Sequence, residues 1–176
     1  MEIQNSTVND ITKILELYRI ATDFMKSKQQ VAWPEFSKEL VFKEIEELRQ
    51  WKLILDDKIA CIWSTSLNDK SIWGIDNNDP ALYIHKIATH PGFRGQKLIK
   101  QIVDWAELYC KDNNLAYLRI DTVGFNEPLI KHYENVGFNF LGTKNLVDIS
   151  DLPKHYSEGP VCLFQRVVKN NYADKR

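Results

Sequence analysis

The sequence has few cysteines, no long apolar run and almost no net charge, and each absence excludes a class of protein. Its three cysteines are widely spaced among apolar neighbours, which predicts buried, reduced thiols and not a disulfide framework or a metal knuckle. Reduced thiols indicate the cytoplasm. No apolar run approaches the length that spans a bilayer, and residues 1–10 lack the basic and apolar parts of a secretory signal. A net charge of −1 in 176 residues offers nothing to attract nucleic acid or an anionic membrane.

Apolar periodicity predicts a mixed α/β chain. Helical spacing predicts four helices, over residues 8–22, 36–48, 96–112 and 126–135. Short apolar runs predict strands over residues 52–55, 59–67, 82–89, 116–121, 138–147 and 161–168, with a further short strand over 2–4. Residues 23–33 and 68–80 are expected to be loops. We expect one domain over residues 1–168, of the α/β (α+β) class, followed by a polar, frayed tail over residues 169–176.

The turn before the third predicted helix is the first place where chemistry could occur. A helix N-terminus leaves backbone N–H groups unpaired and favours an anion, and a glycine lets the backbone approach a phosphate closely. Here the turn contains Gly92 and Gly95, and Arg94 and Lys97 add positive charge. An ordinary turn with solvated basic side chains would have the same composition, so this segment alone decides nothing.

Residues 84–99 and 126–138 together resemble the GCN5-related N-acetyltransferases, the GNAT superfamily. The family's pyrophosphate loop, Arg/Gln-x-x-Gly-x-Gly/Ala, falls on residues 94–99. Arg94 matches, but Lys97 and Ile99 stand where the family has glycines. Backbone N–H groups remain, so we expect cofactor binding to survive, weakened by crowding or helped by the Lys97 charge. The resemblance implies a mixed, mostly antiparallel central sheet flanked by helices.

The second segment matches the family pattern Asn-x6-Tyr-x3-Gly-Phe, from Asn126 through Tyr133 to Gly137 and Phe138. By resemblance, Asn126 contacts the pantetheine arm, and Tyr133 protonates the leaving thiolate. A phenol with a pKa of about 10 suits that role. A packed helix aromatic remains the alternative for Tyr133, and a simple helix cap the alternative for Asn126.

The central strand, residues 82–89, supplies the candidate base. Strand alternation predicts that Tyr83, His85, Ile87 and Thr89 share one face. In the family, the position of His85 often carries an acidic residue that helps to deprotonate the amine, and a histidine with a pKa of about 6.5 could do the same. A half-buried structural histidine is the open alternative. Asp121, at the end of its strand, is a second base candidate.

The resemblance implies two sets of binding residues. Those expected to contact acetyl-coenzyme A are Ile87, Ala88, Thr89, Arg94, Gly95, Gln96, Lys97, Leu98, Ile99, Asn126 and Tyr133. Those expected to contact the acceptor are Phe24, Met25 and Trp33, with Trp63, Trp73 and Tyr156 as further candidates, all of which could instead be packing residues.

The function implied is an N-acetyltransferase that carries an acetyl group from acetyl-coenzyme A to a primary amine of a small molecule or peptide. The amine attacks directly, without a metal or a covalent enzyme intermediate, and a homodimer is left open. The alternatives are a catalytically inactive domain of the same fold that binds coenzyme A or a protein partner, and a structural domain without cofactor. A doubly wound nucleotide-binding protein is disfavoured, because no GxGxxG is present.

Overall fold

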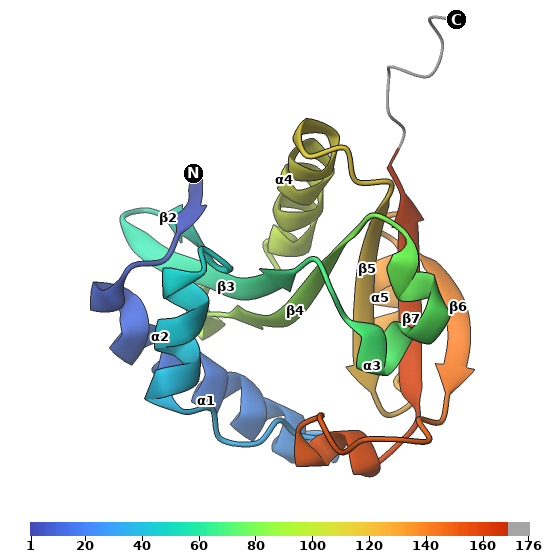
Figure 1. The fold of residues 1–176 in the computed structure, drawn as a ribbon. Helices are drawn as coiled ribbons and strands as arrows, with labels where there is room; N and C mark the ends of the chain where they lie inside the picture. Colours follow the sequence, from blue (N-terminus) through green and yellow to red (C-terminus); the bar gives the residue numbers. More distant parts are fainter. Residues whose placement is uncertain (169–176) are drawn as a thin grey trace, which may run out of the picture.

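The chain folds around a seven-stranded sheet of order β1-β2-β3-β4-β5-β7-β6 (Figure 1). The structure is a computed structural model that describes residues 1–168, so the predicted tail over 169–176 lies outside the described residues. β4 and β5 run parallel, and every other neighbouring pair is antiparallel. The mixed, mostly antiparallel sheet that the family resemblance implies is therefore confirmed.

Every predicted strand and helix is present, with shifted ends. The strands are β1 (Glu2–Asn5), β2 (Gln50–Leu55), β3 (Lys58–Ser66), β4 (Ala81–Thr89), β5 (Tyr117–Val123), β6 (Asn139–Lys144) and β7 (Val161–Val167). The α-helices are α1 (Ile11–Ser27), α2 (Lys38–Glu46), α3 (Lys70–Trp73), α4 (Leu98–Asp112) and α5 (Glu127–Glu134), with short 3-10 turns η1 (Val8–Asp10), η2 (Gly74–Asn78), η3 (Pro91–Phe93) and η4 (Lys154–Ser157). No helix within residues 1–168 has the length and hydrophobicity that crossing a bilayer requires.

Two segments predicted to be loops are partly helical. α1 continues past residue 22 to Ser27, whose hydroxyl donates to the Phe24 carbonyl at 2.7 Å, so Phe24 and Met25 lie in its last turns. The predicted loop over residues 68–80 contains α3 and η2, where Ile72 and Trp73 are buried. Tertiary burial of these apolar side chains stabilises helical turns in a segment whose polar composition predicts no helix.

The helices cover both faces of the sheet (Figure 1). α4 and α5 pack on one face, over a core that includes Trp63, Ile84 and Phe164. On the other face, α1 and α2 pack over Ile62 and Ala88, and α3 packs over Ala81 and Tyr83. Burial of these apolar stripes is the main stabilising contribution to such a layered fold.

A bulge in β4 overturns the predicted alternation along this strand. Lys86 has a left-handed backbone, with φ of 54°, and the β3–β4 register shifts beside it. Because one extra residue reverses the side-chain alternation, Ile87 packs into the same core as Ile84, whereas Tyr83 belongs to the opposite face. The prediction that Tyr83, His85, Ile87 and Thr89 share one face is therefore wrong.

The three cysteines are buried and free, as predicted. Burial raises the pKa of the Cys61 and Cys110 thiols to about 12. Neither thiol ionises at neutral pH, so neither provides a nucleophile.

Candidate active site

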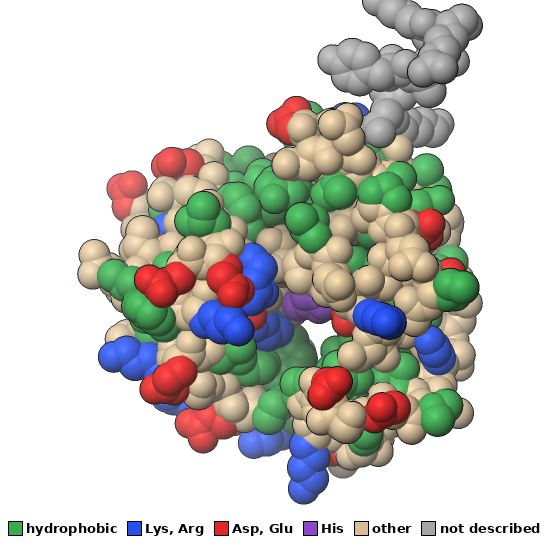
Figure 2. Space-filling model, viewed as in Figure 1, with side chains coloured by type: hydrophobic (Ala, Val, Ile, Leu, Met, Phe, Trp, Pro, Cys, Tyr) green, Lys and Arg blue, Asp and Glu red, His purple; other side chains and the backbone are tan. Residues whose placement is uncertain are grey.

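A cleft opens where β4 and β5 separate. Their parallel pairing ends at Ile84 and Ile120, but both strands continue, to Thr89 and Val123. The cleft between them encloses about 950 Å³, which is enough for a large ligand. Figure 2 looks into this hollow, with a histidine at its wall and basic side chains gathered on the α2 side.

His85 projects from β4 into this cleft, and its hydrogen bonds determine its tautomer. The Ser66 hydroxyl donates its proton to the Asn68 carbonyl at 2.9 Å, and the same oxygen lies 3.3 Å from Nε2 of His85. Nε2 must therefore carry the ring proton and donate it to Ser66. The Nδ1 lone pair is left facing Asp121, whose Oδ1 lies 3.7 Å away.

Asp121 approaches His85 from β5. Its side chain is only 3% exposed, and Oδ2 accepts a 2.8 Å hydrogen bond from the Tyr156 hydroxyl. Burial raises the pKa of this carboxyl to about 6, although the bond from Tyr156 opposes the shift. Asp121 is thus a stronger base than an ordinary carboxylate.

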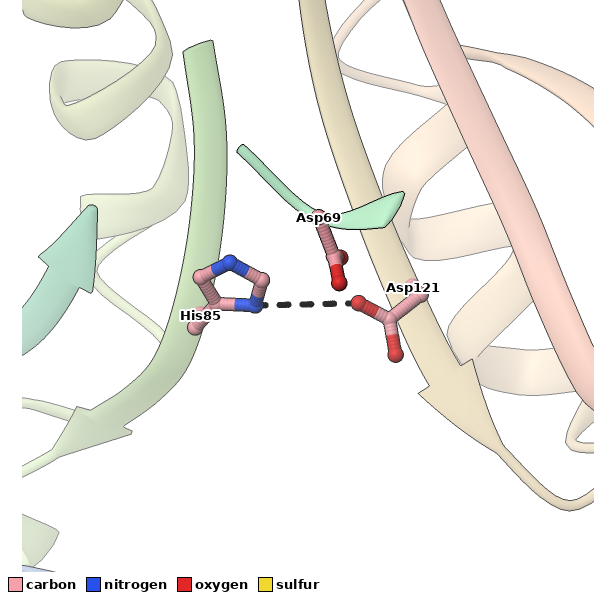
Figure 3. A group of neighbouring side chains, drawn as sticks. All are labelled: Asp69, His85 and Asp121. Carbon is pink, nitrogen blue, oxygen red and sulfur yellow. Dashed lines mark ion pairs between the residues drawn. The ribbon is translucent and has the colours of Figure 1, made fainter. Parts of the chain in front are cut away.

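Asp69 is the third member of the cluster, and the sequence analysis missed it. Figure 3 shows Asp69, His85 and Asp121 turned toward one another from three separate segments. One side-chain atom of each lies within 4.8 Å of the others. Burial, reinforced by the Asp121 charge, raises the pKa of Asp69 to about 7. Nothing in the polar composition of residues 68–80 distinguishes this aspartate from its neighbours, so no sequence signal could have identified it.

A basic group lines the opposite wall. Lys86 extends from the β4 bulge to Oε1 of Glu44 at 2.5 Å, and Arg49 lies 3.8 Å from the same oxygen. Burial, helped by the charges of Lys86 and Arg49, lowers the pKa of His85 to about 4. His85 is therefore neutral at physiological pH, with its Nδ1 lone pair available.

Tyr133 reaches the cleft from α5. Its ring packs against Phe138 and Phe164, with centroid distances of 6.0 and 5.0 Å, and it is one of the residues that line the cavity. Burial, followed by the Asp121 charge, raises the pKa of the phenol well above 10. The hydroxyl keeps its proton at every physiological pH, as a proton donor must.

The helix that carries Tyr133 is bounded as its sequence predicts. The Asn126 side chain caps α5 by accepting from the Leu129 amide at 3.2 Å, and Asn126 also lines the cleft. Gly137 follows the helix with φ of 89°, a conformation that favours glycine. The predicted cap and stop are both confirmed.

Comparison with known proteins decides the family. The family model described as the acetyltransferase (GNAT) family matches residues 14–138, which is most of the chain. The chain belongs to the GNAT family.

Proteins similar to this chain agree with this assignment. A Bacillus subtilis protein, the uncharacterized N-acetyltransferase YesJ, is 29% identical over 102 residues, which are 58% of this chain and 53% of that protein. The match thus spans about half the length of this curated relative. An acetyltransferase GNAT family structure from Listeria monocytogenes has a TM-score of 0.76 at 22% identity, covering 94% of both chains. The ribosomal-protein-S18-alanine N-acetyltransferase of Escherichia coli has a TM-score of 0.68 at 15% identity, covering 99% of this chain and 98% of its own. At these identities the two structures support the fold alone.

The structure explains why the GNAT loop favours glycine at the position of Lys97. Lys97 precedes α4 with φ of 55°, and Gly95 has φ of 80°, so both are left-handed. α4 consequently begins at Leu98 and not at the predicted Gln96. Lys97 is exposed, whereas Ile99 is buried in the core beneath the helix, so the Ile99 side chain does not fill the loop.

The structure separates the predicted site residues into three groups. Ile87, Asn126, Tyr133, Met25 and Trp33 line the cleft with His85 and Asp121. The loop over residues 94–99 lies beyond the end of β4 and outside the cavity lining. Ala88 and Thr89 are also outside the lining: Ala88 is buried in the core beneath α1 and α2, and the Thr89 hydroxyl oxygen lies 3.4 Å from Sγ of Cys61.

The aromatic acceptor candidates divide in the same way. Phe24 lies outside the lining, with the Arg94 guanidinium 4.4 Å from its ring centre. Trp63 and Trp73 are buried packing residues in the cores on opposite faces of the sheet, so neither is available to an acceptor. Tyr156 lines the cleft and binds Asp121.

Asp69→Asn is expected to stabilise the ligand-free protein at pH 8 but not at pH 4. The folded state holds the Asp69 proton up to about pH 7, whereas an unfolded aspartate loses it near pH ~3.9. The contribution of the protonated Asp69 carboxyl to the free energy of unfolding is therefore fully present below about pH 4 and is lost as the pH rises through about 7. Urea unfolding should show a gain on the order of 2 kcal/mol at pH 8 and almost none at pH 4.

Asp151→Asn is the matched control, because Asp151 is exposed. It should leave the free energy of unfolding unchanged at both pH values. An Asp69→Asn variant that is less stable than the parent at pH 8 would contradict the prediction.

Proposed function

We propose that residues 1–168 act as one N-acetyltransferase unit that transfers the acetyl group of acetyl-coenzyme A to a primary amine of a small molecule or peptide. One observation carries the proposal. The cleft between the diverging ends of β4 and β5 brings proton acceptors, His85 and Asp121, into the same cavity as a phenol that stays protonated, Tyr133. Direct transfer from a thioester to an amine needs both functions, one for each proton.

The loop before α4 fits a diphosphate. Within residues 1–168, no carbonyl accepts from the backbone N–H groups of Gly95, Lys97, Leu98 or Ile99. The exposed Arg94 and Lys97 side chains add positive charge at the same helix N-terminus. A Cβ built on Gly95 would meet no atom within 4 Å, so the space in front of the loop is open.

The cleft residues divide the chemistry between them. Acetyl-coenzyme A, when bound, supplies the activated acetyl thioester. The His85–Asp121 pair accepts the first proton from the acceptor nitrogen, which then attacks the carbonyl carbon. Backbone N–H groups on the unpaired edge of β4 beyond Ile84 stabilise the oxyanion. The carbon–sulfur bond breaks, Tyr133 protonates the departing sulfur, and the second nitrogen proton restores the phenol, so one proton is released in the net reaction.

Calorimetric titration with acetyl-coenzyme A, paired with a thiol-release assay over an amine panel, tests the proposal. An active transferase shows saturable heat and amine-dependent release of free thiol. Heat without release identifies the inactive, coenzyme-A-binding alternative. Absence of heat identifies a domain that does not use this cofactor.

Lys97→Gly is expected to leave the affinity for acetyl-coenzyme A unchanged or to tighten it up to about threefold. Glycine adopts a φ of 55° without the Cβ strain that lysine suffers there. It also clears the loop of a long side chain. The dissociation constant is measured by calorimetry.

Lys100→Ala is the control, because it removes an exposed positive charge one turn into α4, where Lys100 pairs with Asp104 at 2.6 Å. Its affinity should match that of the parent. Affinity that falls more than about threefold in Lys97→Gly alone would show that the Lys97 ammonium group is itself a phosphate ligand.

A further inference from the structure

Arg166, on β7, joins the end of the helix that carries Tyr133 to the helix that follows the 94–99 loop. Its Nη1 donates to the backbone carbonyl of Val136 at 2.7 Å, and its Nη2 donates to Oε2 of Glu107, on α4, at 2.8 Å. The two bonds leave from different nitrogens of one planar group, so they fix the orientation of the guanidinium as well as its position. Arg166 therefore sets the spacing between α4 and the end of α5.

The carbonyl that Arg166 binds belongs to the turn that ends α5, and this turn is built on the backbone of Tyr133. The Tyr133 carbonyl accepts from the amides of Val136 and Phe138 at 3.1 and 3.2 Å. Within residues 1–168, no backbone N–H group donates to the Val136 carbonyl, so Arg166 satisfies an acceptor that the helix end leaves open. A movement of this turn would move Tyr133 with it.

Gly137 lets the guanidinium approach the turn closely. A Cβ built on Gly137 would collide with Nη1 of Arg166 and would meet Cζ of the same side chain at 3.2 Å. The φ of 89° at Gly137 is a second reason for glycine at this position. The glycine therefore does more than end the helix, because it also makes room for the arginine.

β7 holds Tyr133 at a second point. Phe164 precedes Arg166 by two residues, so the two side chains leave the same face of the strand. The Phe164 ring packs against the Tyr133 ring with a centroid distance of 5.0 Å. One strand thus contacts the ring of Tyr133 through Phe164 and its turn through Arg166. Arg166 itself is outside the cavity lining, so it touches no reacting group.

We propose that Arg166 is a positioning residue: it holds the turn after α5 against α4 and β7, and so keeps the Tyr133 hydroxyl where it protonates the departing sulfur. Such a transfer depends steeply on geometry, and a misplacement of about 1 Å can lower a rate about a hundredfold. The proposal rests on the proposed acetyl transfer and adds to it the residue that sets the position of the proton donor.

Arg166→Met is expected to lower kcat about tenfold, while KM for the amine and the dissociation constant of acetyl-coenzyme A stay within about threefold of the parent. Methionine fills part of the same space but donates no hydrogen bond. Arg166→Lys keeps the charge and one point of donation, so its kcat should return to within about threefold of the parent. Thiol release by the full chain, with the panel amine that the parent acetylates fastest, and calorimetric titration measure these effects.

A double-mutant cycle with Tyr133→Phe separates positioning from a general loss of structure. If Arg166 acts through the hydroxyl, Arg166→Met should change kcat less than about twofold once the hydroxyl is absent. A tenfold loss that persists in the Tyr133→Phe background would overturn the proposal.

Lys52→Met is the matched control, because it also removes a cation from a largely buried ion pair. The Lys52 side chain is 10% exposed, bonds to Asp10 at 2.7 Å, and is outside the cleft lining. This variant should lower Tm, as Arg166→Met does, but leave kcat within about twofold of the parent. An equal loss of kcat in Lys52→Met would show that lowered stability alone reduces turnover, and it would overturn the proposal.

Hydrogen exchange without cofactor gives a readout that needs no turnover. Arg166→Met should speed the exchange of the backbone amides of residues 133–138 at least about tenfold and leave that of β3, residues 58–66, unchanged. If the parent releases no thiol with any amine but this selective change appears, the proposed transfer fails and the hold of Arg166 on the turn stands. Unchanged exchange over residues 133–138 would overturn the proposal whatever the kinetics show.

Discussion

Replacing Tyr133 with phenylalanine is expected to lower kcat about a hundredfold, while the affinity for acetyl-coenzyme A stays within about threefold of the parent. The variant keeps the ring contacts with Phe138 and Phe164. It loses only the hydroxyl, which stays protonated in the free cleft because burial raises its pKa. Thiol release and calorimetric titration of the same preparation separate turnover from binding.

Tyr109→Phe is the matched control for Tyr133→Phe. Tyr109 lies on α4 and stacks against Trp51 and Trp105, away from the cleft. It should retain the activity of the parent, because the same atom is removed from a packing residue. Equal kcat values for Tyr133→Phe and the parent would remove Tyr133 from the proton-donor role.

The second large effect is expected at Arg119, which lies on β5 and is only 2% exposed. Its guanidinium donates to the side chains of Gln165, Tyr83 and Asp79 and to the backbone carbonyl of Asp76. It also lies 4.6 Å from the ring centre of Trp73. These contacts tie the segment containing α3 and η2, which begins at Asp69, to the sheet.

Arg119→Met should lower the free energy of unfolding by about 3 kcal/mol, because it leaves several buried polar groups without partners. That loss corresponds to a fall of about 6–12 °C in Tm for a chain of this size. Arg119→Lys keeps the charge without the planar fork, and we expect a smaller loss of stability together with a raised KM for the acceptor. Differential scanning calorimetry and steady-state kinetics measure the two effects.

Asp79→Asn controls for the loss of one ion pair. The Asp79 side chain is 46% exposed, so this change should cost less than about 1 kcal/mol. An Arg119→Met variant as stable as the parent would mean that the hydrogen bonds of Arg119 contribute no net stability and that the segment after β3 is held by its apolar side chains alone.

Local sequence signals predicted those parts of the site that depend on short stretches of chain. Asn126 caps α5 and Gly137 ends it, and the spacing between them placed Tyr133 on the cleft side of this helix. The amphipathic pattern of α4 likewise identified its buried face, although Lys97 delayed its start by adopting a left-handed backbone. Capping residues, glycine stops and helical periodicity act over a few residues, so the sequence displays them directly.

The base cluster could be predicted only in part. His85 and Asp121 were recognised as candidates from their places on two strands, but their contact depends on where β4 and β5 lie in the sheet. The bulge at Lys86 could not be anticipated, since lysine carries no preference for a positive φ. Without the bulge, strand alternation assigns Ile87 to the wrong face.

By itself, the sequence determined the order of helices and strands, the burial of the three thiols, and the helix that presents Tyr133. Only the tertiary structure decided that Asp69 joins His85 and Asp121. The physical reason is that no local preference of residues 68–80 directs this loop: a buried arginine on β5 and the apolar contacts of Ile72 and Trp73 position it. Interactions between segments distant in the chain assemble this cluster of three side chains, whereas interactions within each segment shape the elements that carry it.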